Sequence, residues 1–247
     1  MKTYVYSTKK ETSRVAAQKA GEIIKEAIKR KNKATVIVAT GTSQVDFLEF
    51  ITKDSQIDWS KTEVFHLDEY VGISKNHSAS FRKFLKEQFI DKVQPGTAHL
   101  INGDSNDLDE EVNRLNQLIK DKEIDVIFLG IGENGHIAFN DPPADFETED
   151  PYIVVTLDQA CKKQQVGEGW FESLDDVPTK AITISVSQIM KSNNLICVVP
   201  GSRKAEAVRN CFEGNISPKY PASILRNHEY AFVYLDNDSA QLLERTE

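Results

Sequence analysis

Short apolar runs alternate with amphipathic stretches along the whole chain, and this alternation constrains the fold more than any other feature. Six runs rich in β-branched residues are expected to form buried parallel strands, because both faces of each run are apolar. They span residues 34–39, 63–67, 125–130, 181–185, 195–199 and 230–235. Apolar residues recur at helical spacing in the stretches between them. These helices are expected over 13–30, 46–51, 80–89, 108–120 and 202–213.

Strands and helices in alternation predict an α/β fold, with a Rossmann-like, doubly wound, mostly parallel sheet covered by helices on both faces. No repeat, low-complexity tract or linker interrupts the 247 residues, so we expect a single domain over 1–247. Segment 141–177 is the exception, because it holds a Pro-Pro pair, several acids and two glycines without a clean period. Insertions of this kind often form the lid or wall of a site, and we predict a lid there.

Charge and cysteine content exclude several classes of protein. The 30 basic residues against 38 acidic ones give a net charge of −8, which argues against a binder of nucleic acid or of membrane surfaces. Three widely spaced cysteines without a Cys-x-x-Cys motif make a disulfide framework or zinc site unexpected. There is neither a signal-peptide pattern nor an apolar run of roughly 20 residues. We therefore expect a cytoplasmic protein with a small-molecule partner, no metal and no cofactor; its oligomeric state stays open.

Ligands of open parallel sheets bind at the carboxyl ends of the strands, so the segments that follow the strands are the candidate site. After the first predicted strand, Gly41, Thr42 and Ser43 offer a tight turn and exposed backbone N–H groups at a helix start, an arrangement that holds phosphate. An ordinary helix cap by Thr42 or Ser43 is the alternative. After strand 195–199, Ser202, Arg203 and Lys204 are a second candidate phosphate contact, or else a solvated basic pair.

Two further loops carry groups suited to proton transfer. Asp68 and Glu69 follow the second predicted strand, and since neighbouring side chains point differently, we expect only Asp68 to meet a substrate as a general base. A role of the pair in a turn or helix cap is the alternative. Glycine-rich segment 130–142 contains His136 together with Asn134 and Asp141, which could hold the imidazole in one tautomer. Its Gly-x-Gly-x-x-Gly spacing falls at the third predicted strand, and the acid about 20 residues further on is not at a strand end, so we discount a dinucleotide site.

Taken together and in order, four segments resemble the glucosamine-6-phosphate deaminase family over nearly the full chain: 67–72, 130–142, 201–205 and 213–217. Within a wider superfamily of 6-phosphogluconolactonases and sugar-phosphate-sensing domains, the Asn-Gly-His-Ile-x-Phe-Asn run of 134–140 is fairly specific for deaminases. The resemblance implies a metal-free aldose–ketose isomerisation with loss of ammonia, in which glucosamine 6-phosphate and water give fructose 6-phosphate and ammonium.

The resemblance also implies a role for each matching residue. Asp68 would be the base that moves a proton between C2 and C1, and His136 would assist opening of the sugar ring. Asn134 and Asp141 would orient the histidine and contact the amine or the ring oxygen. The phosphate would be held by four residues: Gly41, Thr42, Ser43 and Lys204.

The sequence departs from the family pattern at three places. The first loop usually reads Thr-Gly-Gly-Thr-Pro, where this chain has Thr-Gly-Thr-Ser-Gln at 40–44. Asp141 stands where the family usually has a glutamate. Gly169 stands where the family has a phosphate-binding arginine in the lid, and Lys162, Lys163 or Arg203 could substitute for it. Two alternatives therefore remain beside the deaminase: a lactone hydrolase of the phosphogluconolactonase type, and a non-catalytic sugar-phosphate-binding module.

Overall fold

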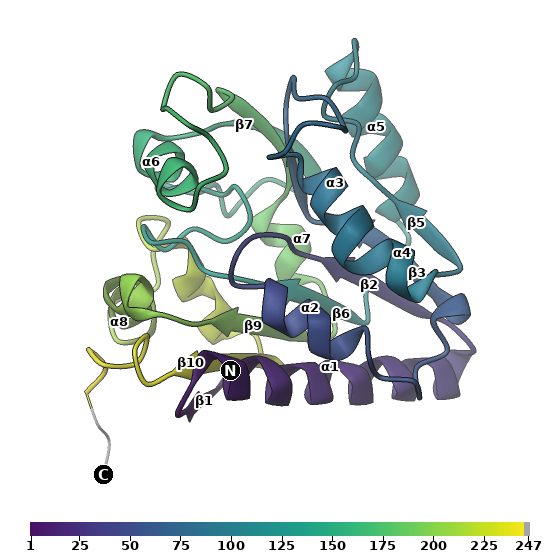
Figure 1. The fold of residues 1–247 in the computed structure, drawn as a ribbon, viewed down its shortest axis with the longest axis horizontal. Coiled ribbons are helices and arrows are strands. Elements are labelled where there is room, and N and C mark those ends of the chain that lie inside the picture. The colour runs from purple at the N-terminus through teal and green to yellow at the C-terminus, as the bar shows by residue number, and fades with distance from the viewer. Residues whose placement is uncertain (245–247) are drawn as a thin grey trace.

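A computed structural model describes residues 1–244 and contains a large parallel sheet beside a small antiparallel one (Figure 1). The large sheet consists of β1 (Lys2–Tyr6), β2 (Ala34–Val38), β3 (Thr62–His66), β5 (Thr97–His99), β6 (Val126–Leu129), β9 (Leu195–Val199) and β10 (Ala231–Asp236). The small sheet consists of β4 (Asp68–Tyr70), β7 (Tyr152–Thr156) and β8 (Lys180–Ile184). The α-helices are α1 (Lys9–Lys31), α2 (Val45–Ile51), α3 (Phe81–Leu85), α4 (Asp91–Val93), α5 (Leu108–Ile119), α6 (Gln159–Gly167), α7 (Val186–Met190) and α8 (Ala205–Phe212).

All neighbouring strands of the large sheet run parallel, in the order β1-β10-β9-β6-β2-β3-β5. The chain leaves β2 toward β3 and β5 on one side, then returns through β6 to build the other side. The point between β2 and β6 is therefore the topological switch of the sheet, where the loops after both strands open a crevice.

Helices cover both faces of the large sheet because side chains alternate along each central strand. In β6, Val126 and Phe128 pack on the face covered by α1, α2 and α3, whereas Ile127 and Leu129 pack on the face covered by α5, α7 and α8. Figure 1 shows α1 running under the large sheet, whereas α6 lies at the upper left, near β7 of the small sheet. The predicted fold class is confirmed: a Rossmann-like, doubly wound, mostly parallel sheet.

One predicted parallel strand is wrong in its placement. Segment 181–185 falls on β8, which pairs antiparallel with both β4 and β7 and lies outside the large sheet. Its residues Ala181, Ile182 and Ile184 are buried like those of a parallel strand, so composition alone does not distinguish the two cases. Short strands β1, β4 and β5 were not predicted, and β7 lies inside the segment that showed no clean period.

The predicted helices occur with shifted bounds. The helix expected over 80–89 divides into α3, a π-helical turn (η2, Lys86–Ile90) and α4, and the one expected over 202–213 begins with a 3-10 turn (η3, Ser202–Lys204) before α8. Two further 3-10 turns lie at Trp59–Lys61 (η1) and Pro221–Asn227 (η4). Within residues 1–244, no helix combines the length and the apolarity that crossing a bilayer requires.

Candidate active site

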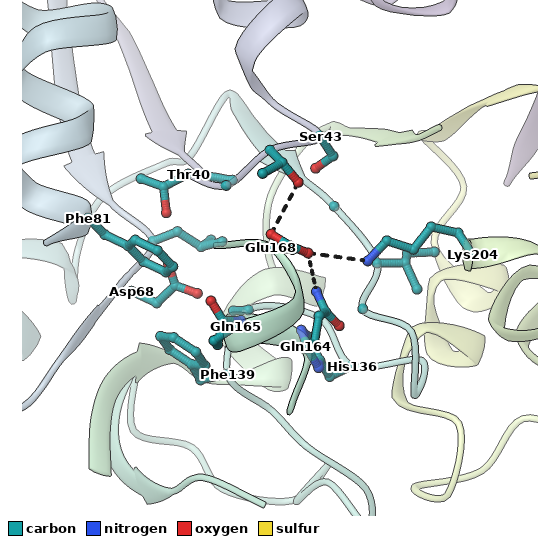
Figure 2. Close-up of a pocket in the computed structure, with 18 residues that line it drawn as sticks. Thr40, Ser43, Asp68, Phe81, His136, Phe139, Gln164, Gln165, Glu168 and Lys204 are labelled. Carbon is teal, nitrogen blue, oxygen red and sulfur yellow. Dashed lines mark hydrogen bonds and ion pairs between the residues drawn. The ribbon is translucent and has the colours of Figure 1, made fainter. Parts of the chain in front are cut away.

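A cavity opens at the switch point of the large sheet, where the loops after β2 and β6 meet (Figure 2). The loop after β2 contributes Gly41, Thr42 and Ser43, and the loop after β6 contributes Gly132 and His136. Gln44 ties the two loops together, because its amide nitrogen donates to the carbonyl of Leu129 at 3.1 Å. Chain topology alone thus brings two of the predicted site segments to one crevice.

Two glycines allow the loops to approach each other and the imidazole. A Cβ on Gly130 would lie 2.9 Å from the hydroxyl of Ser43, and a Cβ on Gly132 would lie 2.2 Å from Cε1 of His136. Any larger residue at 132 would therefore displace the histidine ring from the cavity. These glycines are required by packing around the site rather than by a dinucleotide fold.

Asp68 lies on β4, directly after β3, and faces the same cavity. Burial raises the pKa of its carboxyl to about 8, and the neighbouring carboxylate of Glu69 contributes. Glu69 points away from the cavity, toward the start of α3, where it accepts hydrogen bonds from the hydroxyl of Ser80 and from the backbone N–H groups of Phe81 and Arg82. The alternation of side chains along a strand separates the two acids.

His136 is held from behind by the other two residues of its predicted group. Its Nδ1 lies 3.1 Å from Oδ1 of Asp141, while its backbone N–H donates to Oδ1 of Asn134 at 3.1 Å. Asn134 also donates to Asp141 at 3.2 Å. Burial alone would raise the pKa of the Asp141 carboxyl, but the neighbouring imidazole of His136 outweighs burial and lowers it. Asn134 and Asp141 are placed to orient the imidazole, and neither lines the cavity itself.

Part of the segment predicted as a lid lines the cavity. Helix α6 begins at the cap residue Asp158 and brings Gln164, Gln165 and Glu168 to the cavity wall. Gln165 accepts from the hydroxyl of Tyr70 at 2.5 Å, and Gln164 accepts from the backbone N–H of Glu133 at 2.9 Å. Whether this segment opens is untested, so the lid stays a prediction.

Lys204 reaches the cavity from the 3-10 turn that precedes α8. Burial lowers the pKa of its ammonium group, and the carboxylate of Glu168 partly offsets this effect. Gly169 leaves open space where a side chain would start. Of the three proposed substitutes for an arginine there, only Arg203 lies near, in a hollow that adjoins the cavity and shares Thr42, Ser43, Glu168 and Lys204 with it.

One group of potential metal ligands occurs within residues 1–244. Donor atoms of His136, Asp141 and Cys161 all lie within 4.8 Å of one another, beside the cavity. Burial raises the pKa of the Cys161 thiol. The expectation of a site without metal stays a prediction.

Several residues that line the cavity were missed by the sequence analysis. These are Ala39, Thr40, Leu67, Phe81, Gly130, Ile131, Gly132, Ala138, Phe139, Gln164, Gln165 and Glu168. Thr40 and Phe139 lie within segments that were assigned to the site, 40–44 and 134–140, but neither was given a role of its own. Gln164, Gln165 and Glu168 lie in segment 141–177, which was predicted as a lid or site wall, but no pattern singled them out within it. Phe81 gave no signal, because only tertiary packing brings it to the crevice.

Known proteins resemble this chain over most of its length. A family model described as glucosamine-6-phosphate isomerases/6-phosphogluconolactonase matches residues 7–234. A glucosamine-6-phosphate deaminase of Oenococcus oeni is 35% identical over 230 residues, which cover 93% of this chain and 95% of that protein. The solved structure of a monomeric glucosamine-6-phosphate deaminase is 33% identical and superposes with a TM-score of 0.90, covering 98% of this chain and 100% of the other. A 6-phosphogluconolactonase from Shewanella baltica is 18% identical with a TM-score of 0.79, over 95% of this chain and 97% of that one, a likeness of fold alone.

Proposed function

Because the chain belongs to the family of glucosamine-6-phosphate isomerases and 6-phosphogluconolactonases, we propose that it deaminates and isomerises a hexosamine 6-phosphate. Glucosamine 6-phosphate and water would give fructose 6-phosphate and ammonium. Relatives that are 34–35% identical over most of the chain carry the name glucosamine-6-phosphate deaminase, whereas lactonases resemble it only in fold.

One observation carries the proposal: a buried carboxylate and an imidazole from two different strand ends face one cavity that also contains a candidate phosphate loop. Asp68 lies at the start of β4 and His136 in the loop after β6, and the same cavity is lined by Gly41, Thr42, Ser43 and Lys204. Moving a proton between adjacent carbons next to a carbonyl requires a positioned base, and opening a sugar ring requires a proton carrier at its oxygen.

Asp68 and His136 carry out different proton transfers in the proposed reaction. Asp68 in its ionised form takes the proton from C2 of the open-chain sugar and returns it at C1. His136 moves a proton at the ring oxygen so that the cyclic sugar opens. Asp141 holds the imidazole for that step, and Asn134 holds Asp141 and the backbone N–H of His136. Loss of the 2-amino group as ammonium, with water as the second reactant, then leaves the keto sugar.

Support for a phosphosugar ligand comes from the donors at the end of the cavity opposite Asp68. Lys204 offers an ammonium group there (Figure 2), and loop 41–43, which also lines the cavity, offers the hydroxyl of Thr42 and backbone N–H groups. A cytoplasmic location fits a phosphorylated metabolite and three free, buried cysteines.

Ammonia release from glucosamine 6-phosphate by the purified protein is the experiment that tests the proposal. We expect equimolar fructose 6-phosphate, and the same assay with galactosamine 6-phosphate identifies the preferred epimer. Hydrolysis of 6-phosphogluconolactone without any ammonia release would instead establish a lactonase. Binding of a sugar phosphate without turnover of either substrate would establish a binding module.

A further inference from the structure

A carboxylate of the chain itself stands at the predicted phosphate position. Oε2 of Glu168 accepts hydrogen bonds from the hydroxyl of Thr42 at 3.1 Å and from the indole N–H of Trp170 at 3.2 Å. Its Oε1 accepts from the amide of Gln164 at 2.8 Å and lies 4.0 Å from Nζ of Lys204. Figure 2 shows Glu168 between loop 41–43 and Lys204. The side chain is only 6% exposed, so its place is inside the site.

The donors around Glu168 form the set that a phosphate group needs. A hydroxyl, an indole N–H, an amide and an ammonium group converge on one anionic group, and an incoming phosphate would seek at least the hydroxyl and the ammonium group. Binding of a second anion to these donors costs free energy, because like charges within a few ångströms in a buried site repel strongly. Glu168 and a phosphate therefore exclude each other at this place.

We propose that Glu168 is an intramolecular competitor for the phosphate group of the substrate, so that a phosphosugar binds only when this carboxylate leaves Thr42 and Lys204. The inference rests on the proposed function, since it concerns the same cavity. It makes Glu168 a specificity-determining residue: a ligand must carry enough negative charge to displace it. Neutral sugars gain nothing from the displacement and are disfavoured.

Backbone hydrogen bonds from Glu168, Gly169 and Trp170 back to α6 fix the main chain, so displacement of the carboxylate requires only a rotation of the Glu168 side chain. Gly167 ends the helix and Gly169 follows Glu168 with φ at +81°, a conformation that glycine adopts easily. A Cβ at 169 would meet nothing within 4 Å. The adjoining hollow on the other side of Glu168 is lined by Lys9 and Arg203, which pair with Asp46 at 3.5 Å and with Glu133 at 3.3 Å, so a displaced carboxylate would join two existing ion pairs. A rotation of the Glu168 side chain would therefore move its carboxylate from the vicinity of Lys204 to that of Lys9 and Arg203.

Glu168→Gln tests the competition, because it removes the charge and keeps the shape of the side chain. Inorganic phosphate serves as the probe and its dissociation constant is measured by titration calorimetry. We expect the variant to bind phosphate at least about tenfold more tightly than the unaltered protein, which corresponds to roughly 1.4 kcal/mol. In turnover assays KM for glucosamine 6-phosphate should fall while kcat stays within about twofold, since removal of a ground-state competitor changes binding alone.

Glu172→Gln is the matched control, because Glu172 is an exposed acid four residues further along the same segment and does not line the cavity. Its phosphate affinity should equal that of the unaltered protein. Glu168→Asp provides a second variant if the glutamine variant fails to fold. It draws the carboxylate back by one methylene, so phosphate affinity should rise by a smaller factor.

The inference is overturned if Glu168→Gln binds phosphate as tightly as the unaltered protein or more weakly. It is also overturned if neither the variant nor the unaltered protein binds phosphate at millimolar concentration. A loss of affinity would assign Glu168 to holding the ligand instead. Phosphate binding does not depend on turnover, so the two proposals fail separately. Tighter phosphate binding without any ammonia release would leave the competition intact and refute the deaminase. Ammonia release by the unaltered protein, together with unchanged phosphate affinity in Glu168→Gln, would support the deaminase and refute the competition.

Discussion

Asp68 and Glu69 are neighbours in the chain, yet their carboxylates have different surroundings. Glu69 accepts hydrogen bonds from one hydroxyl and three backbone N–H groups at Tyr70, Phe81 and Arg82, and so serves the start of α3. Asp68 faces the cavity, with burial raising its pKa. The alternation of side chains along β4 produces this division, and it agrees with the expectation that only one of the two acids meets a substrate.

Replacing Asp68 with asparagine should remove the proposed base and preserve its shape. We expect kcat for glucosamine 6-phosphate to fall by about 10²–10⁴-fold or more, the usual contribution of a general base. Binding of fructose 6-phosphate, measured by calorimetry, should change little because the asparagine side chain fills the same volume. A variant with full activity would refute the assignment of Asp68 as the base.

The raised pKa of Asp68 sets the pH dependence of the reaction. Only the ionised carboxylate can accept a proton, and with a pKa of about 8 most of the free enzyme holds Asp68 protonated at neutral pH. The value of kcat/KM should therefore rise about tenfold per pH unit between pH 6 and 7.5, then level off above pH 8. Steady-state rates over this range check the profile. A rate that is flat or falls over the same range would show that another ionisation governs catalysis.

At the scale of elements, helix α6 shows how an irregular segment acquires a defined structure. Its sequence has no clear apolar period, and the helix forms because Asp158 caps its first turn and because Cys161 and Gln165 are buried against the site. The hydroxyl of Tyr70 holds Gln165, so the helix is tied to the small sheet as well. The helix was missed because its stability comes from contacts with distant segments.

Asp158→Ala should loosen α6 without affecting the large sheet. The carboxylate of Asp158 accepts from the backbone N–H of Cys161 at 2.5 Å, and loss of such a cap costs about 1 kcal/mol. Hydrogen exchange of the amides in 159–167 should accelerate by roughly fivefold, while the amides of β6 keep their protection. Asp158→Asn is the control, since asparagine caps helices about as well as aspartate. Equal acceleration in both variants would contradict the capping role.

At the scale of the whole molecule, stability comes from the two helical layers packed against the central strands. Residues of β2, β6 and β9 are fully buried, whereas the edge strand β1 is mostly exposed. Phe128 in β6 has no exposed surface and meets Phe47 edge to face at 4.8 Å between ring centroids. Tyr4 in β1 is 36% exposed and stacks on Tyr234 at 5.3 Å.

Alanine substitutions at Phe128 and Tyr4 should therefore lower the free energy of unfolding by different amounts. Phe128→Ala should lower the free energy of unfolding by about 3–5 kcal/mol, because it removes buried apolar surface and leaves a cavity that the layers cannot fill. Tyr4→Ala should cost about 1 kcal/mol, the order of one partly exposed aromatic pair. Equilibrium urea denaturation measures both. Similar losses for the two variants would show that the edge strand contributes as much as the centre.

The alternation of apolar runs and amphipathic stretches was enough to predict the layered fold, because burial of both faces of a strand is encoded in its own residues. The same local pattern could not place 181–185, since a strand buried in an antiparallel sheet has the same composition as one in a parallel sheet. Loops 40–44 and 130–142 showed their suitability for a site through glycines and polar side chains, before any coordinates.

Tertiary structure alone decided which groups meet. The order of strands brings the loops after β2 and β6 to one crevice, and β4 and α6 add Asp68 and Glu168 from segments 100 residues apart. The carboxylate of Glu168 at the phosphate position has no signature in the sequence, where it reads as one acid among several in an irregular stretch. Sequence periodicity indicates which face of its own helix or strand a residue occupies. The electrostatics of a site depend instead on distances between different elements, which only the folded chain sets.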